Sequence, residues 1–215
     1  MVYVQRSIEA LAAEGFAPEN TLAGVAVCRD ELTRPFVAMV REVWGEAFEL
    51  GSLGGLVFAG KAGIAAMLAH TPVRRRRRAV FFGLSHVGID VDGEVGRVHR
   101  DGHPEASYAC GALVGLLGRL ERGELRTGLD PANIEFSLLR DRVLPRLRHP
   151  AHTDLLELTE VARGLIAAEL DIRVREDAIE VDWALFSGVL IHGPEGDWVA
   201  PGSAWLEVGG ARRAL

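Results

Sequence analysis

Short apolar runs alternate along this chain with longer stretches that repeat apolar residues at helical spacing. The runs at residues 22–27 and 79–84 are short and bounded by polar residues, so they predict buried strands. Helical periodicity is found over residues 31–48, 60–70, 107–119 and 153–170. Strands that alternate with helices are typical of a sheet covered by helices. The sequence therefore predicts an α/β fold, and the absence of linkers and repeats favours a single domain over residues 1–215.

Further strand signals lie in the middle and at the end of the chain. Asp92-Gly93 separates two alternating stretches and predicts a hairpin. Three more strands are predicted at residues 172–174, 179–183 and 189–191. The five arginines at 74–78 follow a Thr-Pro break, and we expect them to form a solvated connection.

Composition narrows the class of protein. Of the 215 residues, 48% are hydrophobic and 25% are charged, which excludes a disordered or fibrous chain. The net charge of −6 argues against a nucleic-acid binder. No apolar run is long enough for a membrane span, and the first residues lack the apolar core of a signal peptide. Two cysteines are too few for a disulfide scaffold, which suits a reducing compartment. Together, these features predict a cytoplasmic protein that binds neither nucleic acid nor membrane.

Three residues are candidates for a metal site. Cys28 and His86 each follow a predicted strand, and the carboxyl ends of strands border the usual ligand crevice of an open α/β sheet. Cys110 lies in the first turn of a predicted helix, where free N–H groups favour a thiolate. Two thiolates and an imidazole select Zn²⁺ and leave a fourth position open. The alternative is that the cysteines are small apolar core residues.

Asp30 and Arg34 are candidate catalytic residues. On a helix that begins near Asp30 they are four residues apart, so an ion pair between them is expected. Arg29 is an alternative partner, and Asp30 is also a plausible helix N-cap. Two residues after a metal-ligating cysteine, Asp30 can orient a metal-bound hydroxide or become a fourth ligand.

Five segments in order carry a resemblance to a known family. They read VCRDELTRP at 27–35, GGLVFAGKAG at 54–63, SHVGI at 85–89, ACGA at 109–112 and IHGP at 191–194. Each segment is weak alone, but together they span nearly the whole chain. The sequence resembles the limiting-CO2-inducible B/C-type proteins, the theta-class carbonic anhydrases, which are related to the beta class.

The resemblance implies a beta-carbonic-anhydrase-like fold with a mixed, largely parallel central sheet flanked by helices, assembled as a homodimer. It implies that Cys28, His86 and Cys110 hold zinc, and that a zinc-bound hydroxide converts CO2 into bicarbonate. It matches Asp30 to the aspartate of an Asp–Arg dyad. Beta-class enzymes carry the arginine two residues after this aspartate, where this chain has Leu32. We therefore expect Arg34 to complete the dyad.

Further candidates surround this site. Aromatic residues suit a small apolar CO2 pocket, and the candidates are Phe58, Phe81 and Phe82. His99 and His103 are candidate proton shuttles because imidazole titrates near neutral pH. His192 is predicted to lie at a strand end behind the ligands.

Two other functions remain as alternatives. One is a catalytically inactive zinc-binding or bicarbonate-sensing module. The other is an enzyme with Cys28 or Cys110 as nucleophile and His86 as base.

Overall fold

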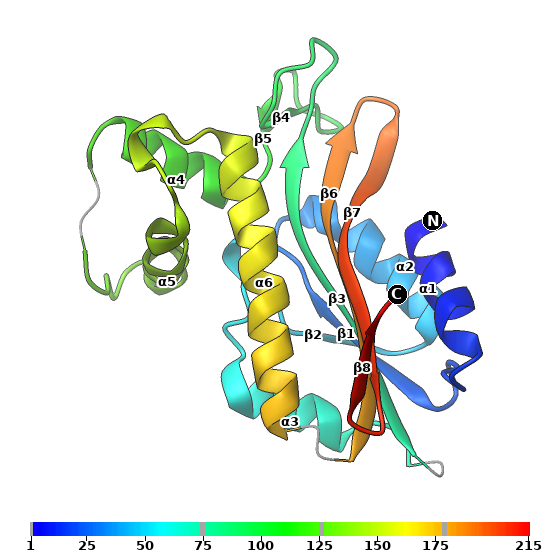
Figure 1. Ribbon diagram of the computed structural model, residues 1–215. Helices are drawn as coiled ribbons and strands as arrows, with labels where there is room; N and C mark the ends of the chain where they lie inside the picture. The colour runs from blue at the N-terminus through cyan, green and yellow to red at the C-terminus, as the bar shows by residue number, and fades with distance from the viewer. Residues whose placement is uncertain (1, 74–75, 125–126, 178–179) are drawn as a thin grey trace.

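A six-stranded mixed sheet forms the centre of the molecule (Figure 1). The computed structural model describes residues 2–73, 76–124, 127–177 and 180–215. The strands lie in the order β2-β1-β3-β6-β7-β8, and the first four are parallel. The last two pairings are antiparallel. Their bounds are β1 Thr21–Ala26, β2 Ala47–Glu49, β3 Arg77–Gly88, β6 Val181–Gly193, β7 Gly196–Val208 and β8 Ala211–Ala214. The predicted α/β fold with a mostly parallel mixed sheet is confirmed.

Helices cover both faces of the sheet (Figure 1). On one face lie α1, Val2–Ala12, and α2, Arg34–Trp44. The other face carries α3 Gly60–Ala69, α4 Gly111–Glu121, α5 Ile134–Val143 and the long α6 Leu155–Asp177. A two-stranded ribbon of β4, Arg97–Val98, and β5, Ser107–Tyr108, lies beyond the end of β3. Within the described residues, no helix has both the length and the apolar character needed to cross a bilayer.

The central strands separate two apolar clusters. Successive side chains of a strand point to opposite faces, so Phe81 packs edge-on against Trp183 on the α6 side. Phe82 stacks on Phe186 on the α1–α2 side. Strands buried on both faces read as continuous apolar runs, which is why residues 79–84 were recognisable in the sequence.

Several predicted boundaries are wrong. The helix predicted to reach residue 48 ends at Trp44, because Gly45 leaves the helix with a φ of 83°, and residues 47–49 form β2. The strand predicted at 172–174 lies inside α6. Val174 continues the buried row of Ile166 and Leu170 at a spacing of four, so the helical period extends beyond residue 170.

Other predictions changed in extent. The Asp92-Gly93 hairpin is reduced to a single bridge between Ile89 and Val95. Residues 189–191 belong to the long strand β6, which also contains residues 181–183, whereas residue 179 lies outside the described residues. Residues 107–108 form β5, so the following helix begins only at residue 111.

The arginine run is more than a solvated connection. Residues 74–75 lie outside the described residues, and residues 77–78 begin β3. Arg76 forms an ion pair of 2.8 Å with the buried Asp182. Arg78 lies over the ring of Phe16 at 5.5 Å. These contacts tie the start of β3 to β6 and to the segment that follows α1.

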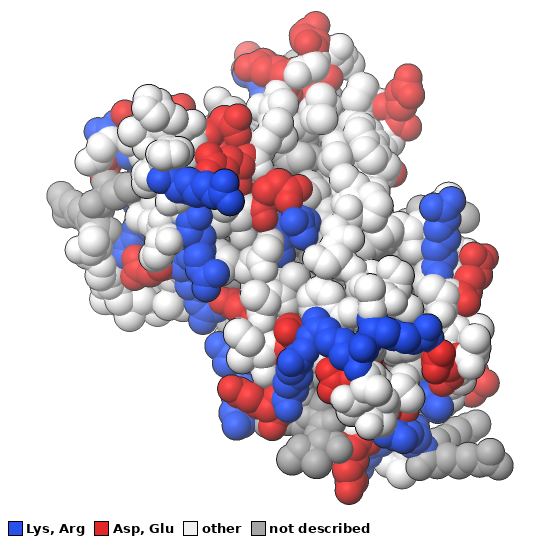
Figure 2. Space-filling model, viewed as in Figure 1, with Lys and Arg blue, Asp and Glu red and all other residues white. Residues whose placement is uncertain are grey.

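Opposite charges lie next to one another on the surface (Figure 2). Asp171 of α6 accepts ion pairs from Arg175 at 2.9 Å and from Arg212 of β8 at 2.8 Å. Exposed pairs of this kind contribute little each, about 0–1 kcal/mol. The pair with Arg212 connects α6 to the antiparallel edge of the sheet.

The backbone of β4 packs closely against the end of β3 at Gly88. A Cβ atom on Gly88 would lie 2.5 Å from the carbonyl oxygen of Arg97 and 3.2 Å from Cβ of Val98. The Gly88 N–H also donates to the Ala109 carbonyl at 3.0 Å. Gly88 therefore fixes both the β4 segment and the residue before Cys110.

We expect Gly88→Ala to lower the free energy of unfolding by about 1–3 kcal/mol, the usual cost of overpacking. Gly164→Ala is the control, because a Cβ there meets nothing within 4 Å on α6. This control should raise stability by about 0.5–1 kcal/mol. Denaturant unfolding measures both variants, and wild-type stability of Gly88→Ala would contradict this account.

Candidate metal centre

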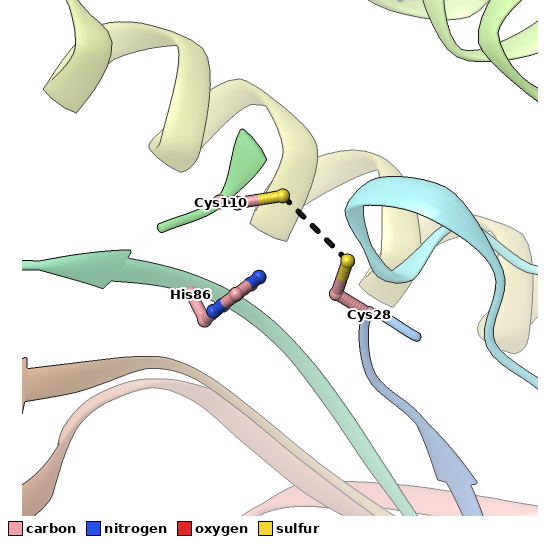
Figure 3. A group of neighbouring side chains, drawn as sticks. All are labelled: Cys28, His86 and Cys110. Atoms are coloured by element: carbon pink, nitrogen blue, oxygen red, sulfur yellow. Dashed lines mark hydrogen bonds between the residues drawn. The ribbon is translucent and has the colours of Figure 1, made fainter. Parts of the chain in front are cut away.

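Three elements bring Cys28, His86 and Cys110 together. Cys28 follows β1 by two residues, and His86 lies near the end of the neighbouring parallel strand β3. Cys110 is the N-cap residue of α4. Figure 3 shows the two sulfurs and one ring nitrogen of His86 turned toward a common point.

The geometry of the three side chains suits a metal. Their ligand atoms all lie within 4.8 Å of one another, and the two Sγ atoms are 3.6 Å apart. Sulfur ligands of a tetrahedral zinc, each about 2.3 Å from the ion, lie about 3.8 Å apart. Both cysteines are free, and the three residues are at most 5% exposed. The predicted Cys₂His cluster is therefore present and can hold a metal ion.

The imidazole of His86 presents one nitrogen to the cluster. Its Nδ1 is 3.1 Å from Nε2 of His192. Its Nε2 is buried and has no hydrogen-bond partner among the described residues. A buried polar atom without a partner is costly unless something else satisfies it. Two soft sulfurs and this nitrogen form a donor set that fits zinc and leaves one coordination position for a further ligand.

The two sulfurs lie within hydrogen-bond distance of each other. The hydrogen bond from Cys110, the nearby His86 imidazole and the Asp30 backbone N–H lower the pKa of Cys28 to about 4, against desolvation by burial. The hydrogen bond to Cys28 and burial raise the pKa of Cys110. The backbone N–H groups of Ala112 and Leu113 act in the opposite direction and favour the Cys110 thiolate. The pocket is thus built to hold negative charge on sulfur.

Asp30 forms its ion pair with Arg100. Nη2 of Arg100 lies 3.2 Å from Oδ1 and 3.3 Å from Oδ2 of Asp30. Nε of the same guanidinium lies 2.5 Å from Glu31 Oε1, and Nη1 donates to the Tyr108 carbonyl at 3.1 Å. The Leu32 N–H donates to Asp30 Oδ1 at 3.2 Å. The carboxylate is therefore held from two sides, and its side chain is 11% exposed.

The expected pairing of Asp30 with Arg34 or Arg29 is corrected by this geometry. Asp30 caps a 3₁₀ turn over Glu31–Thr33, and α2 begins only at Arg34, so Asp30 and Arg34 do not share one α-helical face. Arg29 pairs with Glu135 at 3.0 Å. Arg100 stands 70 residues from Asp30 in the sequence, beyond the reach of any spacing rule.

Arg34 lies in a neighbouring cavity. This cavity of about 630 Å³ is lined by Cys28, Asp30 and Arg34, with Arg41 and Glu49 on its wall. A catalytic contribution of Arg34 remains a prediction that only an activity measurement can test.

The other predicted residues separate in space. Phe81 shares an apolar cluster with both cysteines, whereas Phe82 belongs to the cluster on the opposite face of the sheet. Phe82 is therefore a core residue and does not line a pocket with the cysteines. His99 and His103 are exposed on either side of Arg100, and their role as proton shuttles stays a prediction.

Comparisons with known proteins place the chain in a family. Residues 2–207 match the family described as limiting CO2-inducible proteins B/C beta carbonic anhydrases. Because the match covers nearly the whole chain, the chain belongs to this carbonic anhydrase family, and the resemblance predicted from the sequence is confirmed. None of the curated proteins matches the sequence.

Two solved structures share the fold. One is the limiting CO2-inducible protein LCIB, with 29% identity and a TM-score of 0.82, covering 99% of this chain and 91% of that chain. The other is PtLCIB4, a homolog of LCIB, with 24% identity, a TM-score of 0.86 and the same coverage.

The contact between Glu31 and Arg100 gives a pH prediction. The hydrogen bond from Arg100 lowers the pKa of Glu31 from 4.5 to about 2. The carboxylate therefore stabilises the fold above pH 4.5, and this contribution is lost as the pH falls toward 2. We expect Glu31→Gln to cost at most about 1 kcal/mol at pH 7, since Glu31 is half exposed. Denaturant unfolding at several pH values tests this, and a deficit that persists near pH 2 would contradict it.

Proposed function

We propose that this chain catalyses the reversible hydration of CO2 to bicarbonate with a zinc ion held by Cys28, His86 and Cys110. The observation that carries the proposal is the buried Cys₂His cluster, with a free imidazole nitrogen and thiols 3.6 Å apart, in a member of a carbonic anhydrase family. When bound, zinc lowers the pKa of water from about 15.7 toward 7 and so provides a nucleophile at neutral pH.

The protein residues determine how that chemistry is used. Two thiolates donate more negative charge than imidazoles do, which weakens the acidifying effect of the metal. We infer that Asp30 compensates by accepting a hydrogen bond from the nucleophilic water and orienting it. Arg100 and the Leu32 N–H hold the Asp30 carboxylate in place. This anchoring favours Asp30 as an orienting residue over Asp30 as a fourth ligand.

Metal analysis and CO2 hydration test the proposal together. Purified protein should contain about one zinc per chain, and Cys28→Ser should lose it, since three ligands hold the ion. Stopped-flow hydration should exceed the uncatalysed rate between about pH 6.5 and 9, where the water titrates. Zinc without hydration would favour a binding module. Purified protein without stoichiometric zinc would favour the cysteine-nucleophile alternative.

The dyad assignment is tested by a pair of arginine variants. Arg100→Ala should keep zinc but lower turnover about 10- to 100-fold, the range found when partners of metal-site groups are removed. Asp30→Ala should do the same. Arg34→Ala is the matched comparison, since Arg34 forms no ion pair with Asp30 in the described part of the chain. A larger loss in Arg34→Ala than in Arg100→Ala would overturn the assignment.

The homodimer implied by the family resemblance is likewise a proposal. Light scattering on the purified protein should give twice the chain mass of 23.3 kDa. A mass of one chain at micromolar concentration would contradict it.

A further inference from the structure

Behind His86, two more polar side chains continue a hydrogen-bonded row. Nδ1 of His86 lies 3.1 Å from Nε2 of His192, and Nδ1 of His192 lies 2.9 Å from Oδ1 of Asp197. The two imidazole rings are nearly perpendicular, at 80°. The row runs from β3 through β6 to β7, because His192 pairs with Gly88 on one side and with Asp197 on the other.

The chemistry of each partner fixes the direction of these hydrogen bonds. An ionised carboxylate only accepts, so Nδ1 of His192 must carry the hydrogen toward Asp197. The His192 side chain is 2% exposed, so a second ring hydrogen, with the positive charge that it brings, would be buried at a high cost. Its Nε2 is then an acceptor, and Nδ1 of His86 must donate to it.

The direction of these hydrogen bonds leaves one ring nitrogen of His86 without a hydrogen. A neutral imidazole has one N–H, and in His86 it stands on Nδ1. Nε2 then offers its lone pair toward the two sulfurs, where it has no other partner in the described residues. With the opposite order, Nε2 would carry a hydrogen and could not bind a metal.

We propose that His192 and Asp197 are positioning residues that hold His86 in the tautomer required for metal binding. The inference rests on the proposed zinc site. Packing alone does not account for this arrangement, because an apolar side chain at 192 could fill the same buried space but would leave Nδ1 of His86 without an acceptor. Partners of metal-ligating histidines fix the tautomer and ring orientation in this way in general.

The first test uses metal-free protein and does not depend on catalysis. Nitrogen-15 NMR distinguishes a protonated ring nitrogen from a bare one. The wild type should show His86 with its hydrogen on Nδ1 and its Nε2 bare, and His192 likewise. A His86 with its hydrogen on Nε2 would overturn the proposal.

The second test measures zinc affinity by competition with a chelator. His192→Phe removes the acceptor, and we expect zinc to bind about 10- to 100-fold more weakly. His192→Gln keeps an acceptor oxygen and should restore most of the affinity. Wild-type affinity in His192→Phe would show a packing role only and would overturn the proposal.

Two more variants sharpen the comparison. Asp197→Ala frees the outer end of the row, so part of the His86 signal should move to the other tautomer. Glu195→Gln is the matched control, because Glu195 is an exposed acid at the turn of the same hairpin. It should change neither tautomer nor affinity, and an unchanged spectrum in Asp197→Ala would remove Asp197 from the proposal.

The two tests separate this inference from the proposed function. If the wild type binds no zinc, the proposed function fails, and the NMR result alone decides the order of the hydrogen bonds. If zinc binds and the tautomer is the opposite one, the metal centre stands and the positioning role fails.

Discussion

The parallel pairing of β1 with β3 brings two ligands of the metal centre to one edge of the sheet. The register runs without interruption from Thr21 opposite Arg78 to Ala26 opposite Gly83. Cys28, just past the end of β1, and His86, within the last residues of β3, therefore lie at about the same level of the sheet. The third ligand depends on the same strand, because the Gly88 N–H holds the carbonyl of Ala109 just before Cys110. These backbone contacts therefore bring the ligand atoms of all three residues to one buried point.

The local patterns of the sequence were sufficient for the central elements. Residues buried on both faces of the sheet form continuous apolar runs, and these placed β1 and β3. The chain's two cysteines and a histidine near a strand end then became candidates for a metal cluster, because an open α/β sheet gathers strand ends at one edge, and the family resemblance implied that they are the ligands. The antiparallel half was less predictable. Strand β7 is largely exposed, and its apolar and polar residues alternate poorly. The C-terminal part of α6 was predicted as a strand from residues 172–174, but Ile166, Leu170 and Val174 are buried at a helical spacing of four.

The charge partner of Asp30 was beyond sequence reasoning for a physical reason. A spacing rule works only inside one regular element, and Asp30 precedes a 3₁₀ turn rather than an α-helix. Arg100 reaches it from the loop after β4, which is placed by the close contact with Gly88. The contact between His192 and His86 likewise depends on the register of the neighbouring strands β3 and β6, which the sequence does not show. The His192 segment was noticed in the sequence, but its partner Asp197 was not.

The origin of Arg100 has a consequence for how such chains are found. The guanidinium that faces Asp30 is supplied from a remote loop, while Leu32 occupies the position that carries the arginine in the beta class. A search that demands an arginine close behind this aspartate would discard chains of this kind as defective. Their completeness can be judged only after the loop has been placed in space.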